Sequence, residues 1–293
     1  MILPSDRWRH AADVWRRVDD LGFAHAWTFD HVTWRDLPDG PWFAALPTLA
    51  AAAAVTRRVA LGMLVATPNF RHPVPLAKEA MTLHDTSAGR FILGLGAGGG
   101  GADATVIARE PWSAAERADR FAEFATLTTR LLRERRVDHH GAYYHSDGVS
   151  MSPGCPGLRV AVAATGPRGL RIAARHADIW VTNGHTPRPG LTAAAAEPGL
   201  VARQVARFRE LCAETGRSPD RMLVLANRDS SPPRSYGEFM EAAHAYREAG
   251  ITDLVVPYPR TAAPFAGDAG VFERIAAELT DGALRDGAVR CAE

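Results

Sequence analysis

The sequence has 293 residues, of which 46% are hydrophobic and 23% are charged, and its formal net charge is +1 at pH 7. This balance leaves no surplus of basic residues to neutralise a nucleic-acid backbone, and the chain has no apolar run of about 18 residues that could cross a membrane. We therefore expect neither nucleic acid nor a membrane among its partners.

The cysteines and the first residues favour a cytoplasmic protein. Cys155, Cys212 and Cys291 are odd in number and widely spaced, which fits neither a disulfide framework nor a zinc site. The opening residues, MILPSDRW, lack the basic-then-apolar pattern of a signal peptide.

Short apolar runs alternate with helical patterns in the first half of the chain. A very short first strand over residues 1–3 precedes a helix over 6–21, capped by Ser5 or Asp6. The further expected elements are strand 23–28, helix 41–55 (from Pro41), strand 59–66, helix 73–87, strand 91–95 and helix 113–135, which opens on a Ser113–Glu116 capping box.

The alternation continues in the second half after a small inserted hairpin over residues 137–151. The expected elements are strand 158–163, a helix from Gly166, strand 179–182, a Pro/Ala loop over 185–197, helix 200–215, strand 222–226, helix 236–249, strand 253–256 and helix 271–279. Eight strand–helix units, the first strand being stunted, predict a single (β/α)8 TIM barrel over residues 1–293.

Polar side chains follow the second and third strands. A histidine beside a carboxylate, His31 after Asp30, can exchange a proton with a bound substrate, or it can hold its own loop together. Thr67 and Asn69 offer short polar groups to a ligand edge, although T-P-N is also ordinary turn chemistry. Trp34 is either a packing residue, like most tryptophans in such a loop, or the wall of a pocket. Arg71 and His72 could belong to the ligand loop or could equally be surface residues that pack over Phe70.

The fourth strand leads into a glycine-rich loop. Residues 94–99 satisfy G-x-G-x-x-G, which makes a dinucleotide-binding fold a rival interpretation. No helix starts for roughly ten residues after the motif, so no helix N-terminus meets a pyrophosphate. We interpret Gly96 and Gly98 as letting the backbone approach a flat ligand closely.

Two later loops complete the candidate set. Thr165, Gly166, Pro167 and Arg168 connect a strand to a helix and could bind a cofactor phosphate through first-turn N–H groups and the guanidinium, or they could simply cap the helix. Thr182 follows the next strand. Barrel closure brings all these loops to one face. His139, His140 and His145 have no carboxylate or cysteine that completes a set, so we expect no metal.

At these residues the chain resembles the bacterial luciferase-like superfamily of flavin- and deazaflavin-dependent oxidoreductases. The matching stretches are LGFAHAWTFDH (21–31), GMLVATPNFRHPVPLAKEAMTLHDTSAGRFILGLGAGG (62–99), ERADRFAEF (116–124), AVAATGPRGLRIAARHADIWVTNG (161–184) and EAGITDLVV (248–256).

The resemblance implies a (β/α)8 barrel that carries FMN or coenzyme F420 at the carboxyl ends of its strands. It places Asp30 and His31 beside the reactive side of the ring, a non-proline cis peptide at Leu64–Val65 behind it, and Thr67 and residues 165–168 at the cofactor edge and phosphate. In the family's sugar-phosphate dehydrogenases a Glu follows the glycine loop as proton donor, whereas this chain has Gly99 there.

The leading hypothesis is F420-dependent hydride transfer to or from a small organic substrate. The alternatives are an FMN-dependent two-component monooxygenase and, more remotely, a non-catalytic barrel subunit. The resemblance also implies a homodimer and a separate flavin or F420 reductase as partner.

Overall fold

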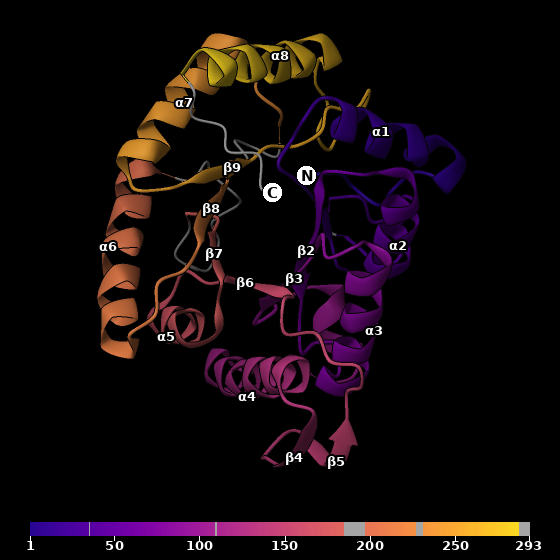
Figure 1. The fold of residues 1–293 in the computed structure, drawn as a ribbon, viewed down its shortest axis with the longest axis vertical. Coiled ribbons are helices and arrows are strands. Elements are labelled where there is room, and N and C mark those ends of the chain that lie inside the picture. The colour runs from indigo at the N-terminus through magenta and orange to yellow at the C-terminus, as the bar shows by residue number, and fades with distance from the viewer. Residues whose placement is uncertain (35, 109, 185–196, 227–230, 287–293) are drawn as a thin grey trace.

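The structure is a computed structural model that describes residues 1–34, 36–108, 110–184, 197–226 and 231–286. Its central feature is a sheet in which every neighbouring pair of strands is parallel (Figure 1). The seven strands, in spatial order, are β1 (His25–Phe29), β2 (Ala60–Ala66), β3 (Phe91–Gly96), β6 (Arg159–Ala163), β7 (Ile179–Thr182), β8 (Arg221–Leu225) and β9 (Asp253–Val255).

Residues 1–3 lie between the first and the last of these strands. The N–H of Ile2 donates to the carbonyl of Trp27 in β1 at 2.8 Å, and on the other side the N–H of Tyr258 donates to the carbonyl of Met1 at 2.7 Å. The three residues therefore occupy the place of a strand and nearly close the sheet into a barrel. The predicted barrel with a stunted first strand is confirmed.

Helices surround the sheet in Figure 1. They are α1 (Trp8–Asp20), α2 (Ala45–Val55), α3 (Pro73–Thr86), α4 (Ala114–Arg133), α5 (Pro167–His176), α6 (Pro198–Thr215), α7 (Tyr236–Glu248) and α8 (Ala269–Asp286), with a short 3₁₀ helix η1 (Ala102–Thr105). Within the described ranges, none of the helices has the length and apolar character that a membrane crossing requires.

Two predicted helix starts are wrong. The N-cap of α1 is Arg7, not Ser5 or Asp6, and no side chain caps that helix. Helix α2 begins at Ala45 rather than at Pro41, because the N–H of Phe43 donates to the carbonyl of Pro4 and holds the preceding residues against the N-terminal segment.

The apolar core has two layers because alternate strand residues point to opposite faces of the sheet. The outer layer lies between sheet and helices and includes Trp15, Leu61, Phe91 and Phe124, whereas the barrel interior holds Met1, Leu3, Trp27, Ile92 and Phe265. Cys155 and Cys212 are buried free thiols, and burial raises the pKa of both; Cys291 lies outside the described residues.

The predicted hairpin is present as β4 (Arg136–His140) and β5 (His145–Ser150), which pair antiparallel. Glu123 of α4 anchors it by accepting hydrogen bonds from the N–H groups of Tyr143 and Tyr144. The expectation that no carboxylate accompanies the hairpin histidines is wrong, because Asp147 points to the same face of the ribbon as His145 and approaches it to 2.8 Å.

Candidate functional site at the carboxyl ends of the strands

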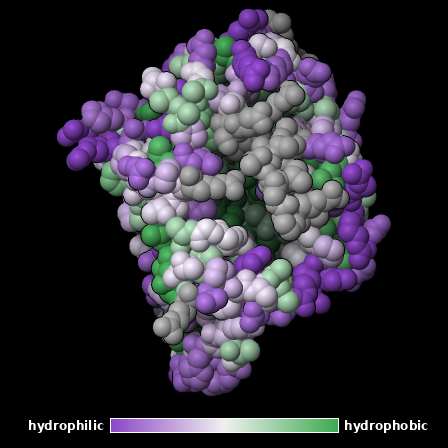
Figure 2. Space-filling model, turned by 180° about the vertical axis from the view of Figure 1, so that it is seen from behind, coloured by the Kyte–Doolittle hydropathy of each residue, from purple (hydrophilic) through white to green (hydrophobic). Residues whose placement is uncertain are grey.

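The loops that follow β1, β2 and β3 are bonded to one another. Asp30 after β1 pairs with Arg71 after β2, His31 pairs with Asp103 after β3, and Asn69 donates to the carbonyl of Gly99 at 3.2 Å. The carboxyl ends of parallel strands lie on one side of the sheet, so these three loops meet at one end of the barrel, which we call the mouth. On the face shown in Figure 2 the molecule is hollowed at its centre over a hydrophobic floor. The predicted convergence is confirmed for these three loops.

His31 and Asp103 form the acid–base pair of this mouth. Nδ1 of His31 lies 2.5 Å from Oδ2 of Asp103, while Oδ1 accepts a hydrogen bond of 2.9 Å from the N–H of Val32. Burial acts to raise the pKa of Asp103, but the hydrogen bonds from His31 and Val32 outweigh it and hold that pKa below its ordinary value. The side chain of His31 remains 35% exposed, and no described residue is hydrogen-bonded to its other ring nitrogen, Nε2.

Asp30 has a different partner from its neighbour in sequence. Its carboxylate, 1% exposed, accepts two hydrogen bonds from the Arg71 guanidinium at 2.7 and 3.0 Å. Burial raises the pKa of Asp30 against the opposing pull of Arg71. The interpretation of Arg71 as a surface residue is wrong: its guanidinium also lies 5.1 Å from the ring of Phe70, but the buried carboxylate holds it at the mouth.

Aromatic side chains line the mouth next to His31. The Trp34 ring lies 5.3 Å from Phe29, 5.4 Å from Trp42 and 5.8 Å from Phe265, measured between centroids. The indole N–H of Trp42 donates to the carbonyl of His31 at 2.9 Å. These rings make one wall, and Trp34 belongs to the apolar interior of the barrel.

The end of β2 departs from a regular strand. The peptide bond between Leu64 and Val65 is cis, as the family resemblance implies, and both side chains belong to the barrel interior. The register with β3 shifts between Met63 and Ala66.

Two glycines of β3 make room for this irregularity. A Cβ on Gly94 would stand 1.9 Å from the carbonyl oxygen of Met63, and one on Gly96 would stand 2.4 Å from the side chain of Val65. The G-x-G-x-x-G match therefore reflects contact between strands, and η1, not a long helix, follows it.

The segments after β2 and β3 contain one buried hydroxyl without a partner among the described residues and a stretch of backbone with open space beside it. The hydroxyl of Thr67 is buried and has no hydrogen-bond partner among the described residues. Gly98, at φ +74°, lies against the side chain of Asn69, whereas the space around Gly99 is open. A ligand bound there can supply the hydrogen-bond partner that the Thr67 hydroxyl lacks.

Helix α5 begins at this end of the barrel beside β3, since Gly96 pairs with Ala163 in register. Gly166 is its N-cap and Pro167 its first residue, and within the described part of the chain no side chain caps the helix. The Arg168 side chain, 56% exposed, lies 3.4 Å from Asp119 and donates to the carbonyl of Ala115. Thr165 precedes this turn and is half-buried.

Thr182 ends β7 but its hydroxyl is engaged within the protein. It donates to Oε1 of Gln204 at 2.7 Å and accepts from the N–H of Gly184 at 2.9 Å. The loop expected over residues 185–197 lies outside the described residues except for Glu197.

The profile of the luciferase-like monooxygenase family matches residues 2–288. The chain belongs to this family. The match covers nearly the whole sequence, including the segments that form the barrel of this luciferase-like protein.

Curated relatives of this luciferase-like chain include dehydrogenases and a monooxygenase. It is 39% identical over 179 residues to the F420-dependent glucose-6-phosphate dehydrogenase of Intrasporangium calvum, a match that covers 59% of this chain and 53% of the relative. It is 29% identical over 211 residues to the 4-hydroxyprotoasukamycin monooxygenase of Streptomyces nodosus subsp. asukaensis, covering 70% and 53%. The chain spans about half the length of these curated relatives.

Solved structures share its fold. An F420-dependent secondary alcohol dehydrogenase in complex with an F420–acetone adduct superposes with a TM-score of 0.76 at 18% identity, covering 94% of this chain and 97% of that one.

Sequence reasoning missed Asp103 and the pairing of Arg71. Asp103 lies in the segment after β3, where the prediction concerned only the glycines, and it is 72 residues from His31. A signal was present, because an acidic residue shortly after a strand of a parallel barrel lies at the mouth. A partner for Asp30 could have been sought among the cations that follow neighbouring strands.

A cavity of about 220 Å³ lies away from the mouth, among residues of β1, β9 and α8. Apolar side chains such as Val18, Phe239 and Phe272 line it, together with His25 and Asp253. It contains none of the candidate residues.

Proposed function

We propose that this luciferase-like chain is a coenzyme F420-dependent oxidoreductase that transfers a hydride to or from a small organic substrate. The observation that carries the proposal is the His31–Asp103 pair beside an apolar wall at the carboxyl ends of the strands. The names of the curated dehydrogenase relative and of the structural neighbour described above both include F420. This similarity supports F420 as the cofactor.

The residues at the mouth fit a planar cofactor with a phosphate. Thr67 presents a buried hydroxyl that lacks a partner, and a Cβ at Gly99 or Gly166 would meet open space. The uncapped first turn of α5 suits a phosphate because its N–H groups have no partner within the helix. The proposed cofactor-binding set is Leu64, Val65, Thr67, Asn69, Gly96, Gly98, Thr165, Gly166, Pro167, Arg168 and Thr182.

Coenzyme F420, when bound, supplies the carbon atom that gives or takes the hydride. The protein supplies the proton exchange that accompanies it, and we assign this to His31. Asp103 occupies Nδ1, so Nε2 takes the proton from a substrate hydroxyl during oxidation and returns it to a carbonyl oxygen during reduction. The proposed substrate is therefore an alcohol or its carbonyl counterpart.

Asp103 acts in this proposal as a positioning residue. An ionised carboxylate at Nδ1 fixes the tautomer and stabilises the imidazolium that forms when Nε2 accepts a proton. This pair supplies acid–base chemistry in a site where Gly99 stands in the position of the family's glutamate.

Asp30 and Trp34 complete the assignment. The buried Asp30–Arg71 pair holds the loops after β1 and β2 together, so Asp30 orients the segment that carries His31. Trp34, packed against Phe29 and Trp42, forms the substrate wall.

A homodimer, a separate F420 or flavin reductase and a cytoplasmic location belong to the same proposal. They rest on the family resemblance and on the cysteine pattern. Light scattering of the purified protein measures the first of these directly, and a monomer at micromolar concentration contradicts it.

The rival function is an FMN-dependent monooxygenase, a class represented among the relatives. Titration of the purified protein with F420 and with FMN, followed by cofactor fluorescence, separates the two. We expect saturable F420 binding and much weaker FMN binding, and then F420-linked turnover of simple secondary alcohols or ketones. Tight FMN binding without F420 binding, with oxygen uptake on reduced FMN, overturns the proposal.

A further inference from the structure

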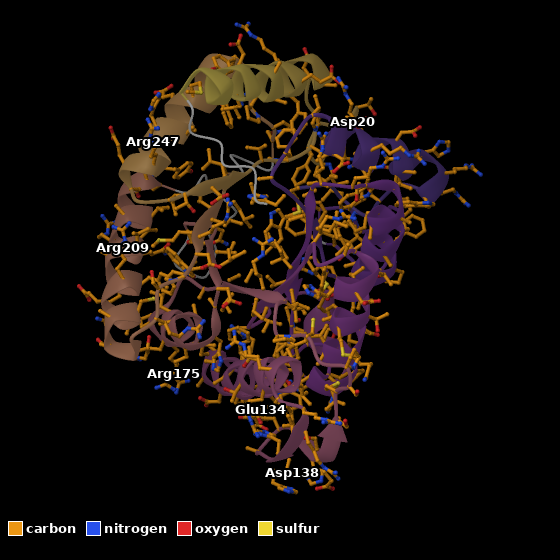
Figure 3. All side chains as sticks on the ribbon, viewed as in Figure 1. Asp20, Glu134, Asp138, Arg175, Arg209 and Arg247 are labelled. Atoms are coloured by element: carbon orange, nitrogen blue, oxygen red, sulfur yellow. The ribbon has the colours of Figure 1, made fainter. Side chains whose placement is uncertain are left out.

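The hairpin β4–β5 extends from the barrel beyond α4, at the lower end of the view in Figure 1. Its two faces differ in composition. Val137 and Ser146 are buried toward the barrel, whereas the opposite face presents Asp138, His140, His145 and Asp147 to solvent. Figure 3 shows Asp138 at this far end of the molecule.

Three of these side chains converge on one another. His140 and His145 face each other in register across the two strands, and their Nδ1 atoms lie 3.1 Å apart. Asp147, two residues after His145 and on the same face, lies 2.8 Å from Nε2 of His145 and 3.6 Å from Nε2 of His140. One ligand atom from each residue can be chosen so that all three lie within 4.8 Å of one another.

This donor set has a chemical preference. Two imidazoles and one carboxylate are ligands of zinc-class divalent cations, because imidazole nitrogen favours these metals over magnesium and calcium, which prefer all-oxygen sites. The paired strands of the hairpin fix the backbone positions of His140, His145 and Asp147. A bound metal therefore has to order only their exposed side chains. Three protein ligands would leave a coordination position open to solvent.

The third histidine of the hairpin, His139, does not take part. His139 points to the other face of β4, where its ring lies 3.0 Å from Glu123 of α4. The hairpin is thus fastened to the barrel by Glu123 on one face, and the converging set stands free on the other.

We infer that the hairpin is a binding site for a zinc-class divalent cation, with His140, His145 and Asp147 as its ligands. The bound metal links β4 to β5 next to the turn at residues 141–144. This site is separate from the candidate active site and does not depend on the proposed function.

The test is a zinc titration of chelator-treated, dialysed protein in competition with a chromophoric chelator at neutral pH. We expect about one zinc ion per chain at micromolar affinity. His140→Ala and His145→Ala should each weaken binding by at least about 10-fold, and Asp147→Asn by a smaller factor. His244→Ala, an exposed histidine on α7, is the matched control and should leave the affinity unchanged.

Circular dichroism of each metal-free variant verifies its fold, and the exposure of all three side chains makes unfolding by these substitutions unexpected. No zinc bound by the wild type at 100 μM, roughly a hundred times a micromolar Kd, overturns the inference. So does equal zinc affinity in His140→Ala, His145→Ala and the wild type. F420 binding, measured on the same samples, reports separately on the proposed function.

Discussion

Nδ1 of His31 lies 2.5 Å from the carboxylate of Asp103, although 72 residues separate the two in sequence. The contact joins the loop after β1 to the 3₁₀ helix after β3, and it leaves one ring nitrogen of the histidine for the ligand side. The same carboxylate also accepts from the N–H of Val32, so Asp103 fixes both the ring and the backbone beside it.

Asp103→Asn should lower kcat by about 100-fold while leaving the F420 Kd close to that of the wild type. An amide in place of the carboxylate no longer fixes the tautomer that presents Nε2 as a base, so the loss should fall on kcat and not on cofactor affinity. Steady-state rates and a fluorescence titration with F420 measure the two quantities. Asp13→Asn, at an exposed carboxylate of α1, is the control, and an unchanged kcat in Asp103→Asn contradicts the positioning role.

His31→Ala should reduce turnover far more than cofactor affinity. Removal of the group that exchanges the proton costs roughly 100- to 10,000-fold in rate, whereas the contacts proposed for the cofactor lie mainly on β2, β3 and α5. Measurements of kcat and of the F420 Kd on His31→Ala and on the wild type test this prediction. A larger loss in affinity than in rate would reassign His31 to cofactor binding.

Arg71→Ala should destabilise the fold by about 3–5 kcal/mol, because it leaves the Asp30 carboxylate buried without its partner. Urea unfolding measures this loss, and Asp30→Asn/Arg71→Ala should recover part of it. Burial already raises the pKa of Asp30, and loss of the guanidinium raises it further. A carboxyl with a raised pKa favours folding at low pH, so the difference from the wild type should shrink as the pH falls. A constant difference between pH 7 and pH 4 would contradict this account.

Arg168→Ala should weaken F420 binding by roughly 10-fold if the guanidinium turns from Asp119 to a cofactor phosphate. The present contact of Arg168 with Asp119 is largely exposed to solvent, so little stability should be lost with it. Fluorescence titration measures the affinity, and Arg175→Ala at the other end of α5 is the matched control. Equal affinities in the two variants would leave Arg168 a surface charge.

His176 should make the fold sensitive to acid. Burial, together with the nearby Arg133 and Arg217, lowers its pKa from 6.5 to about 4, and its ring nitrogens lie near the hydroxyls of Thr126 and Thr129. Between these pH values the unfolded chain binds a proton that the folded chain does not. The fold therefore loses up to roughly 3 kcal/mol from this group as the pH falls from 7 to 4. Unfolding free energies of the wild type and His176→Gln across this range measure the effect, and parallel curves would contradict it.

Local patterns in the sequence determined the elements of this protein. The Ser113–Glu116 capping box forms as predicted at the start of α4, and Pro167 begins α5. The alternation of strands and helices specified the barrel, and with it the face on which the loops after the strands meet. These features depend on residues a few positions apart, whose preferences act whatever the rest of the chain does.

Tertiary structure alone decided which side chains pair at the mouth and on the hairpin. Asp30 is adjacent to His31 in sequence, yet it binds Arg71 while His31 binds Asp103. On the hairpin, Asp147 reaches the histidines because the two strands pair in a particular register. The order of residues along the chain cannot specify such contacts, because they arise only when parallel strands bring distant loops to one edge and antiparallel pairing sets opposite residues face to face.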